Sequence, residues 1–152
     1  MLLTQILRTD SVKVPLESTE KTACITELVE LLAANGLLSD KQMALDAVLA
    51  REKTRSTGIG SAVAIPHGKC LAVKELVMAI GIARDSIDFE SIDGKPVKIV
   101  LLLISPPDQT GPHIKALASI SRLMLDENFK SSMEQAESAE KLYEHLSKKE
   151  QA

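Results

Sequence analysis

The chain has 152 residues, of which 45% are hydrophobic and 26% charged, as expected for one globular domain with its own core. Its formal net charge of −3 gives no electrostatic reason to expect a nucleic acid or an anionic membrane as partner. The longest apolar run, Ile99 to Ile104, is too short to span a bilayer, and the N-terminus lacks the pattern of a signal peptide. We therefore expect a single cytoplasmic domain over residues 1–152, without a disulfide framework because only two cysteines are present.

Two helices are predicted in the N-terminal third of the chain. Residues 19–35 place apolar side chains at the spacing of one buried helical face, and Asn35-Gly36 supplies a left-handed stop. The second helix is predicted to begin with Ser39 and Gln42 as a capping-box pair and to end at about Arg51.

A loop and several strands follow these helices. Residues 54–60 are rich in Gly, Ser and Thr, which predicts a loop. Residues 63–65 predict a short strand, which Pro66 closes. Residues 76–83 and 97–104 are apolar on both alternations, a pattern typical of central strands that are covered on both faces.

The last part of the chain predicts further helices. Pro112 suits the first position of a helix, where its missing N–H is not needed. Shorter helices are predicted around residues 130–135 and 138–147. The alternation of helices and strands predicts an α/β sandwich, with a mixed sheet of four or five strands flanked by helices.

Two of the three histidines lie where an apolar element meets a loop. His67 follows a strand and a proline, and His113 lies at the start of a helix after a proline-rich loop. Functional sites of α/β proteins gather at such positions, although spacing alone favours an ordinary turn histidine at His67. His145 lies in a polar helical segment and is predicted to be a surface residue.

The segment before His67 has the composition of an oxyanion-binding loop. Arg51 and Arg55 bring positive charge, and Ser56, Thr57 and Gly58 offer hydroxyls and accessible backbone N–H groups. On glycine content alone, an ordinary turn is the better interpretation. The loop lacks the Gly-Lys-Ser/Thr ending of a Walker motif and the last glycine of the dinucleotide fingerprint, so nucleotide binding is not expected.

Two other kinds of chemistry fit the sequence poorly. His67, Cys70 and His113 give at most three metal ligands of mixed type, whereas structural zinc sites use four, so we predict no metal. No Gly-x-Ser-x-Gly pattern is present, which disfavours a Ser–His–Asp hydrolase.

Several segments together carry a family resemblance. The runs Arg51-Glu52-Lys53, Ser56-Thr57-Gly58-Ile59-Gly60 and Ala64-Ile65-Pro66-His67-Gly68-Lys69 closely resemble the signature of the mannitol/fructose-type enzyme IIA domains. These domains belong to the phosphoenolpyruvate-dependent phosphotransferase system. The similarity continues through residues 89–97 and 107–117, so it covers almost the whole chain.

The resemblance implies a phosphoryl carrier. His67 matches the phosphorylated histidine, which receives its group from the phosphocarrier protein HPr. His113 matches the second active-site histidine, which hydrogen-bonds the phosphoryl group, and Arg51 matches an arginine that balances its charge. Ser56, Thr57 and Gly58 are expected to add donors to the phosphate. Because the donor is another phosphohistidine, no cofactor, ATP or magnesium is expected.

The sequence defines the branch of the family less sharply than the family itself. Residues 107–110 and the Ser-Thr-Gly-Ile-Gly loop look more like the nitrogen-regulatory enzyme IIA proteins, whose phosphorylation controls target proteins. A sugar-specific member that passes phosphate to a cysteine of an enzyme IIB is the alternative. A degenerate paralogue that is not phosphorylated is a third, which the intact His67, His113 and Arg51 disfavour. Arg55 and Ser61-Ala62 depart from the family pattern, since Asn-Gly is common at the latter positions.

Overall fold

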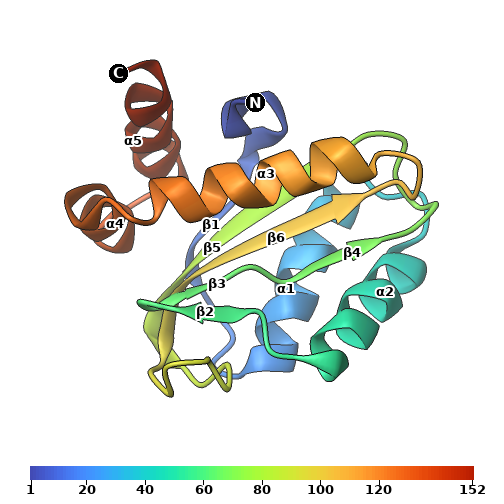
Figure 1. Ribbon diagram of the computed structural model, residues 1–152, viewed down its shortest axis with the longest axis horizontal. Coiled ribbons are helices and arrows are strands. Elements are labelled where there is room, and N and C mark those ends of the chain that lie inside the picture. The colour runs from blue at the N-terminus through green and yellow to red at the C-terminus, as the bar shows by residue number, and fades with distance from the viewer.

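A six-stranded mixed sheet separates two layers of helices in the computed structural model, which describes residues 1–152 (Figure 1). The two longest strands, β5 (Val77–Ile87) and β6 (Val97–Ser105), pair antiparallel at its centre. The other strands are β1 (Leu7–Leu16), β2 (Gly58–Gly60), β3 (Val63–Ala64) and β4 (His67–Lys69). The order is β1-β5-β6-β3-β2, and β4 continues beside β6 beyond β3.

The predicted fold class is confirmed, although the sheet has six strands where four or five were predicted. Both apolar runs are central strands as predicted, because β5 lies between β1 and β6, and β6 lies between β5 and the pair β3/β4. Three strands had no predicted range: β1, β4 and the short β2, which falls inside the segment predicted to be a loop.

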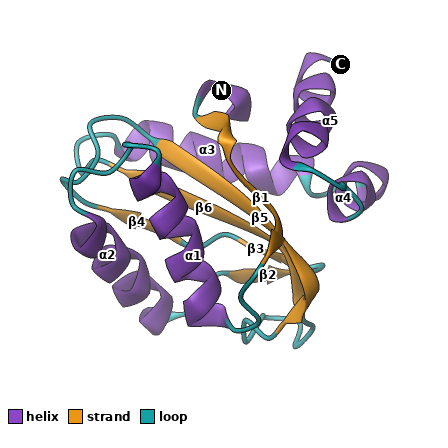
Figure 2. Cartoon of the chain, turned by 180° about the vertical axis from the view of Figure 1, so that it is seen from behind, coloured by secondary structure: helices purple, strands orange, loops and turns teal.

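Helices cover the two faces of the sheet separately. On one face lie α1 (Lys21–Ala34) and α2 (Lys41–Thr54), which Figure 2 shows in front of the strands. On the other face lies α3 (Thr110–Leu123), with α4 (Glu127–Glu134), α5 (Ala139–Gln151) and the 3₁₀ turn η1 (Leu3–Gln5) at one end. No helix of the structure combines the length and apolar character needed to cross a bilayer.

Strand β6 is apolar at almost every position because both of its faces are covered. Val100 and Leu102 pack in the core under α1 and α2, whereas Ile99 and Leu101 pack in the core on the α3 side. All four side chains are fully buried. The site described below lies at the end of this strand, so it rests on a strand that is buried at every position except Lys98.

Helix α2 begins and ends at different residues from those predicted. Its N-cap is Asp40, whose carboxylate accepts a hydrogen bond from the Met43 backbone N–H, so the prediction of a Ser39–Gln42 capping box was wrong. The Ser39 hydroxyl instead donates to the carbonyl of Ala72. The helix continues to Thr54, which places Arg51 within its last turn.

Helix α3 begins before Pro112, which was predicted to be its first residue. The first helical residue is Thr110, and the buried face comprises His113, Ala116 and Ile120 among others. Because His113 belongs to this face, its side chain points toward the sheet.

The hairpin turn between β2 and β3 places two non-glycine residues in the left-handed region. Ser61 has φ 55° and Ala62 has φ 68°. Several contacts hold this turn in place: the Ser61 N–H donates to Asp93, the Lys130 ammonium donates to the Ser61 carbonyl, and the Ala62 carbonyl accepts two further backbone N–H groups. The family's frequent Asn-Gly pair would adopt this conformation with less strain.

We expect Ala62→Gly to raise the free energy of unfolding by about 1 kcal/mol, because it relieves the left-handed strain of an alanine. Urea unfolding measures this change. Ala50→Gly, at an exposed position of α2, is the matched control and is expected to lower stability by about 1 kcal/mol. An equal loss in both variants would show that the turn stores no strain.

Candidate functional site

His67 opens β4, and one hydrogen bond fixes its tautomer. Its Nδ1 lies 2.8 Å from the carbonyl oxygen of Ile65. Because a carbonyl oxygen only accepts, Nδ1 must carry the proton, and Nε2 then has a free lone pair. Burial lowers the pKa of His67 below its ordinary value, and the Arg51 and Lys69 cations lower it further. The imidazole is therefore held neutral at neutral pH, with Nε2 as a nucleophile.

Gly68 brings helix α2 against the strand that carries His67. A Cβ atom at this position would lie 3.0 Å from the backbone nitrogen of Val48 and 3.1 Å from the carbonyl carbon of Ala47. Only glycine allows so close an approach of helix and strand backbones. The contact places Arg51, one turn further along α2, beside His67, where both line a shallow depression.

His113 reaches the same depression from α3 on the opposite face of the sheet. Its ring centroid lies 5.3 Å from that of His67, with an angle of 62° between the ring planes. The side chain is almost fully buried, and its Nδ1 lies 2.6 Å from the Ser105 hydroxyl. Burial, with the neighbouring His67 and Lys69, lowers the pKa of His113 to about 4.

The Nε2 atoms of both imidazoles are open to the depression. Neither Nε2 atom has a hydrogen-bond partner within the chain. If either were buried, it would be a buried polar atom without a partner, but the only such side-chain atom is the hydroxyl oxygen of Ser91. Both Nε2 atoms must therefore be accessible to solvent, on the surface that the two rings share. The structure thus brings together His67, His113 and Arg51, as the sequence predicted.

Arg51 is anchored by one end of its guanidinium. Its Nη1 donates to the carbonyl of Arg55 at 2.8 Å and to the Thr54 hydroxyl at 3.3 Å. These bonds hold the side chain at the end of α2 and leave other N–H groups of the fork without a partner. Lys69 adds a second cation to the rim, where its ammonium donates to the Thr110 hydroxyl at 3.1 Å.

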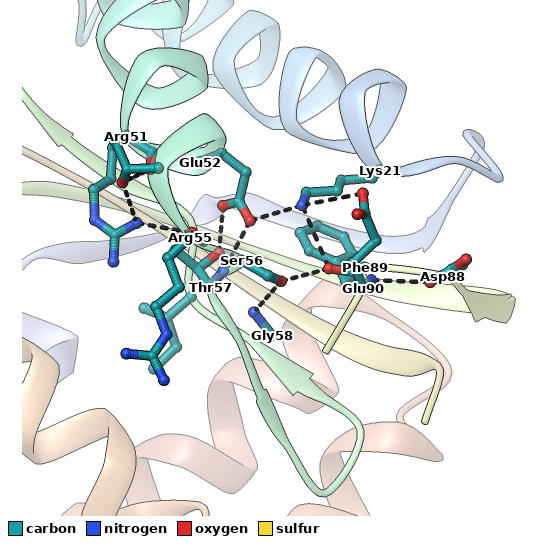
Figure 3. A network of polar contacts seen from close by, with 12 residues as sticks. Lys21, Arg51, Glu52, Arg55, Ser56, Thr57, Gly58, Asp88, Phe89 and Glu90 are labelled. Atoms are coloured by element: carbon teal, nitrogen blue, oxygen red, sulfur yellow. Dashed lines mark hydrogen bonds and ion pairs between the residues drawn. The ribbon is translucent and has the colours of Figure 1, made fainter. Parts of the chain in front are cut away.

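The three loop residues predicted to bind phosphate have their polar groups engaged elsewhere (Figure 3). The Thr57 N–H and hydroxyl both donate to the buried carboxylate of Glu52. The Ser56 hydroxyl donates to the carbonyl of Phe89 and accepts from the Gly58 N–H. None of the three lines the depression that holds the histidines.

These contacts correct the prediction that Ser56, Thr57 and Gly58 supply donors to a phosphate. The two hydroxyls and the N–H groups of Thr57 and Gly58 are already used, and release of Thr57 would leave the buried Glu52 carboxylate without its hydrogen bonds. Glu52 also forms an ion pair of 2.9 Å with Lys21, so the loop is fastened to both α1 and α2 (Figure 3). The loop therefore supports the site and does not line it.

Sequence reasoning missed three residues that shape the site. Lys69 follows His67 by two positions in a strand and therefore lies on the same side, a signal that was available. Ser105 and Glu52 gave no signal, because their partners are known only from the fold. No cluster of three or more His, Cys, Asp or Glu side chains suited to a metal ion is present.

The low pKa of His113 has a measurable effect on stability. The folded state keeps this imidazole neutral down to about pH 4, whereas the unfolded chain takes up the proton near its ordinary pKa of 6.5. Between pH 6.5 and about pH 4 the unfolded state therefore binds more protons than the folded state. The contribution of His113 to the free energy of unfolding is fully present above the unfolded pKa and is lost as the pH falls toward 4.

We expect the free energy of unfolding to fall less in His113→Gln than in the unchanged protein between about pH 7 and about pH 4.5. Urea unfolding at the two pH values measures both differences, and carboxylates common to both proteins cancel in the comparison. The same fall in the two proteins would show that His113 does not titrate differently on folding.

Comparisons with known proteins agree on one family. The profile described as "Phosphoenolpyruvate-dependent sugar phosphotransferase system, EIIA 2" matches residues 5–149. The chain is 36% identical over 138 residues to the PTS system fructose-specific EIIABC component of Bacillus subtilis, which is 91% of this chain but 22% of that protein. It is 36% identical over 121 residues to a nitrogen regulatory protein of Klebsiella oxytoca, 78% of this chain and 74% of the relative.

A solved structure shows the same arrangement. The nitrogen regulatory protein IIA-Ntr from Neisseria meningitidis superposes with a TM-score of 0.83 at 28% identity, covering 95% of this chain and 98% of that one. The three-layer architecture described above is therefore that of a known group of proteins.

Proposed function

Because this chain belongs to the EIIA 2 family of the phosphoenolpyruvate-dependent sugar phosphotransferase system, we propose that His67 accepts a phosphoryl group on Nε2 and later passes it on. The observation that carries the proposal is the hydrogen bond from His67 Nδ1 to the Ile65 carbonyl. It leaves Nε2 as an unprotonated nucleophile, accessible in a depression that also contains a second histidine and an arginine.

The reaction needs no proton transfer at His67. Its Nε2 lone pair attacks the phosphorus of a donor phosphohistidine, a new nitrogen–phosphorus bond forms, and the bond to the donor nitrogen breaks. The donor leaves as a neutral imidazole, and the proton on His67 Nδ1 stays in its hydrogen bond to the Ile65 carbonyl. Catalysis is then mostly a matter of position and charge.

Arg51, Lys69 and His113 supply the charge and the hydrogen bonds. The two cations line the depression although the whole chain carries a net charge of −3, so positive charge is concentrated where a phosphoryl group would lie. His113 stays neutral, so it can form a hydrogen bond to the phosphoryl group without adding a competing charge. The same cations help to keep His67 unprotonated and reactive.

For the partners, we propose HPr as the donor and a regulatory role for the phosphorylated state. The similarity to IIA-Ntr over nearly the full length of both chains supports this branch. The alternative is transfer to a cysteine of an enzyme IIB. It is supported by the equal identity to the Bacillus subtilis fructose-specific EIIABC component, of which this chain matches only a part.

The direct test is transfer of labelled phosphate from phosphoenolpyruvate through enzyme I and HPr to this protein. We expect one labelled group that is labile in acid and stable in base, as for a phosphohistidine. Candidate enzyme IIB proteins are then added to the labelled protein. Retention of the label supports the regulatory branch, net transfer to an enzyme IIB cysteine supports the alternative, and no labelling contradicts the proposed function.

A further inference from the structure

Ser105 is the last residue of β6 and lies next to both histidine-bearing elements. In the sheet it pairs with Lys69, two residues after His67, and its carbonyl accepts the Cys70 N–H at 3.0 Å. Its side chain has no exposed surface, and its hydroxyl lies 2.6 Å from His113 Nδ1. Backbone pairing therefore holds this hydroxyl in a fixed position beneath the second histidine.

Two arrangements of protons are compatible with the 2.6 Å contact. Either the Ser105 hydroxyl donates to Nδ1, and Nε2 carries the ring proton, or Nδ1–H donates to the hydroxyl and Nε2 is bare. In the second arrangement the buried Ser105 proton has no acceptor, because the hydroxyl contacts no other polar group. Since an unsatisfied buried donor is costly, the first arrangement is favoured.

We propose that Ser105 is a positioning residue that fixes the tautomer of His113, so that Nε2–H points into the depression beside His67. In this arrangement His113 presents a hydrogen-bond donor, whereas the other tautomer would present a lone pair to the phosphoryl oxygens. The placement of the proton follows from the contacts of the resting protein, and only its use toward a phosphoryl group rests on the proposed function.

Nitrogen NMR of the unphosphorylated protein at neutral pH tests the placement without any transfer reaction. We expect His113 to show a protonated Nε2 and an unprotonated Nδ1 that accepts a hydrogen bond. Ser105→Ala is expected to change these signals toward a mixture of tautomers. Ser91→Ala is the matched control, because it removes a buried hydroxyl that has no partner, and it should leave His113 unchanged.

Transfer rates from phosphorylated HPr test the use of the tautomer. At metal sites, loss of the group that orients a ligating imidazole costs about 10-fold to 100-fold, and we expect Ser105→Ala to slow labelling by about tenfold. Ser105→Thr, which keeps the hydroxyl, should restore the tautomer and most of the rate.

A His113 that is protonated on Nδ1 in the unchanged protein would overturn the inference. So would a Ser105→Ala variant with both the tautomer and the rate of the unchanged protein. Either result leaves labelling of His67 intact and so spares the proposed function. If the unchanged protein takes no label at all, the function fails, while the NMR measurement still reports on Ser105.

Discussion

A His67→Ala variant is expected to take up no phosphoryl group from phosphorylated HPr. The variant lacks Nε2 of residue 67, the nitrogen at the start of β4 that combines a free lone pair with access to the depression. The cations and hydrogen-bond donors of the depression stabilise a phosphoryl group but offer no nucleophile to accept it. Labelling should therefore be lost completely and not merely slowed. Labelling followed over hours with excess donor measures it.

Two controls separate this chemistry from folding. His145→Ala removes the histidine on α5, outside the depression, and should label like the unchanged protein. The helical content and urea midpoint of His67→Ala should be close to those of the unchanged protein, because this half-buried side chain contributes little to the core. Normal labelling of a folded His67→Ala protein would mean that the accepting residue has been misassigned.

Replacing His113 with Ala is expected to slow labelling by about 100-fold to 1,000-fold without abolishing it, the usual cost of losing one preorganised donor to a developing charge. Nε2 of His67 remains in place and can still attack, and Arg51 and Lys69 still line the depression. Rapid-quench measurement of the first transfer gives the rate, and long incubation gives the endpoint.

His113→Gln provides a graded control for that variant. Its amide keeps an N–H donor of similar reach, so its rate should lie between those of His113→Ala and the unchanged protein. If His113→Ala transfers at the unchanged rate, the second histidine has no part in the reaction. If a folded His113→Ala protein never labels, His113 performs the chemical step itself.

The central strands were predictable from the sequence, whereas the edge of the sheet was not. Residues 77–83 of β5 and nearly all of β6 are apolar because helices cover both faces, and that pattern is local. Strand β1 contains Arg8, Asp10 and Pro15 and pairs with β5 through irregular register shifts, so it shows no regular alternation. Its existence depends on the neighbouring strand, which a local pattern does not reveal.

The sequence predicted that His67 and His113 lie together, as the structure has them, but it misplaced the loop before His67. Both histidines were predicted from the long motif around His67 and the matching residues 107–117. Ser56 and Thr57 have the right chemistry for phosphate and were placed in the site on composition. The fold gives the hydroxyl of Ser56 to Phe89 and that of Thr57 to Glu52, and neither residue lines the depression.

The buried face of α3 runs through His113 and not through the apolar residue beside it. Ile114, the next residue of the helix, and Leu125, two residues after its end, have exposed fractions of 60% and 80%. The buried stripe instead includes a histidine, whose Nδ1 is satisfied by Ser105.

The most direct test of the account is nitrogen and phosphorus NMR of the protein after phosphorylation by HPr. The structure predicts coupling of the phosphorus to Nε2 of His67, with Nδ1 still protonated and hydrogen-bonded to the Ile65 carbonyl. A phosphoryl group on Nδ1 of His67, or on any other residue, would contradict the mechanism proposed for this depression.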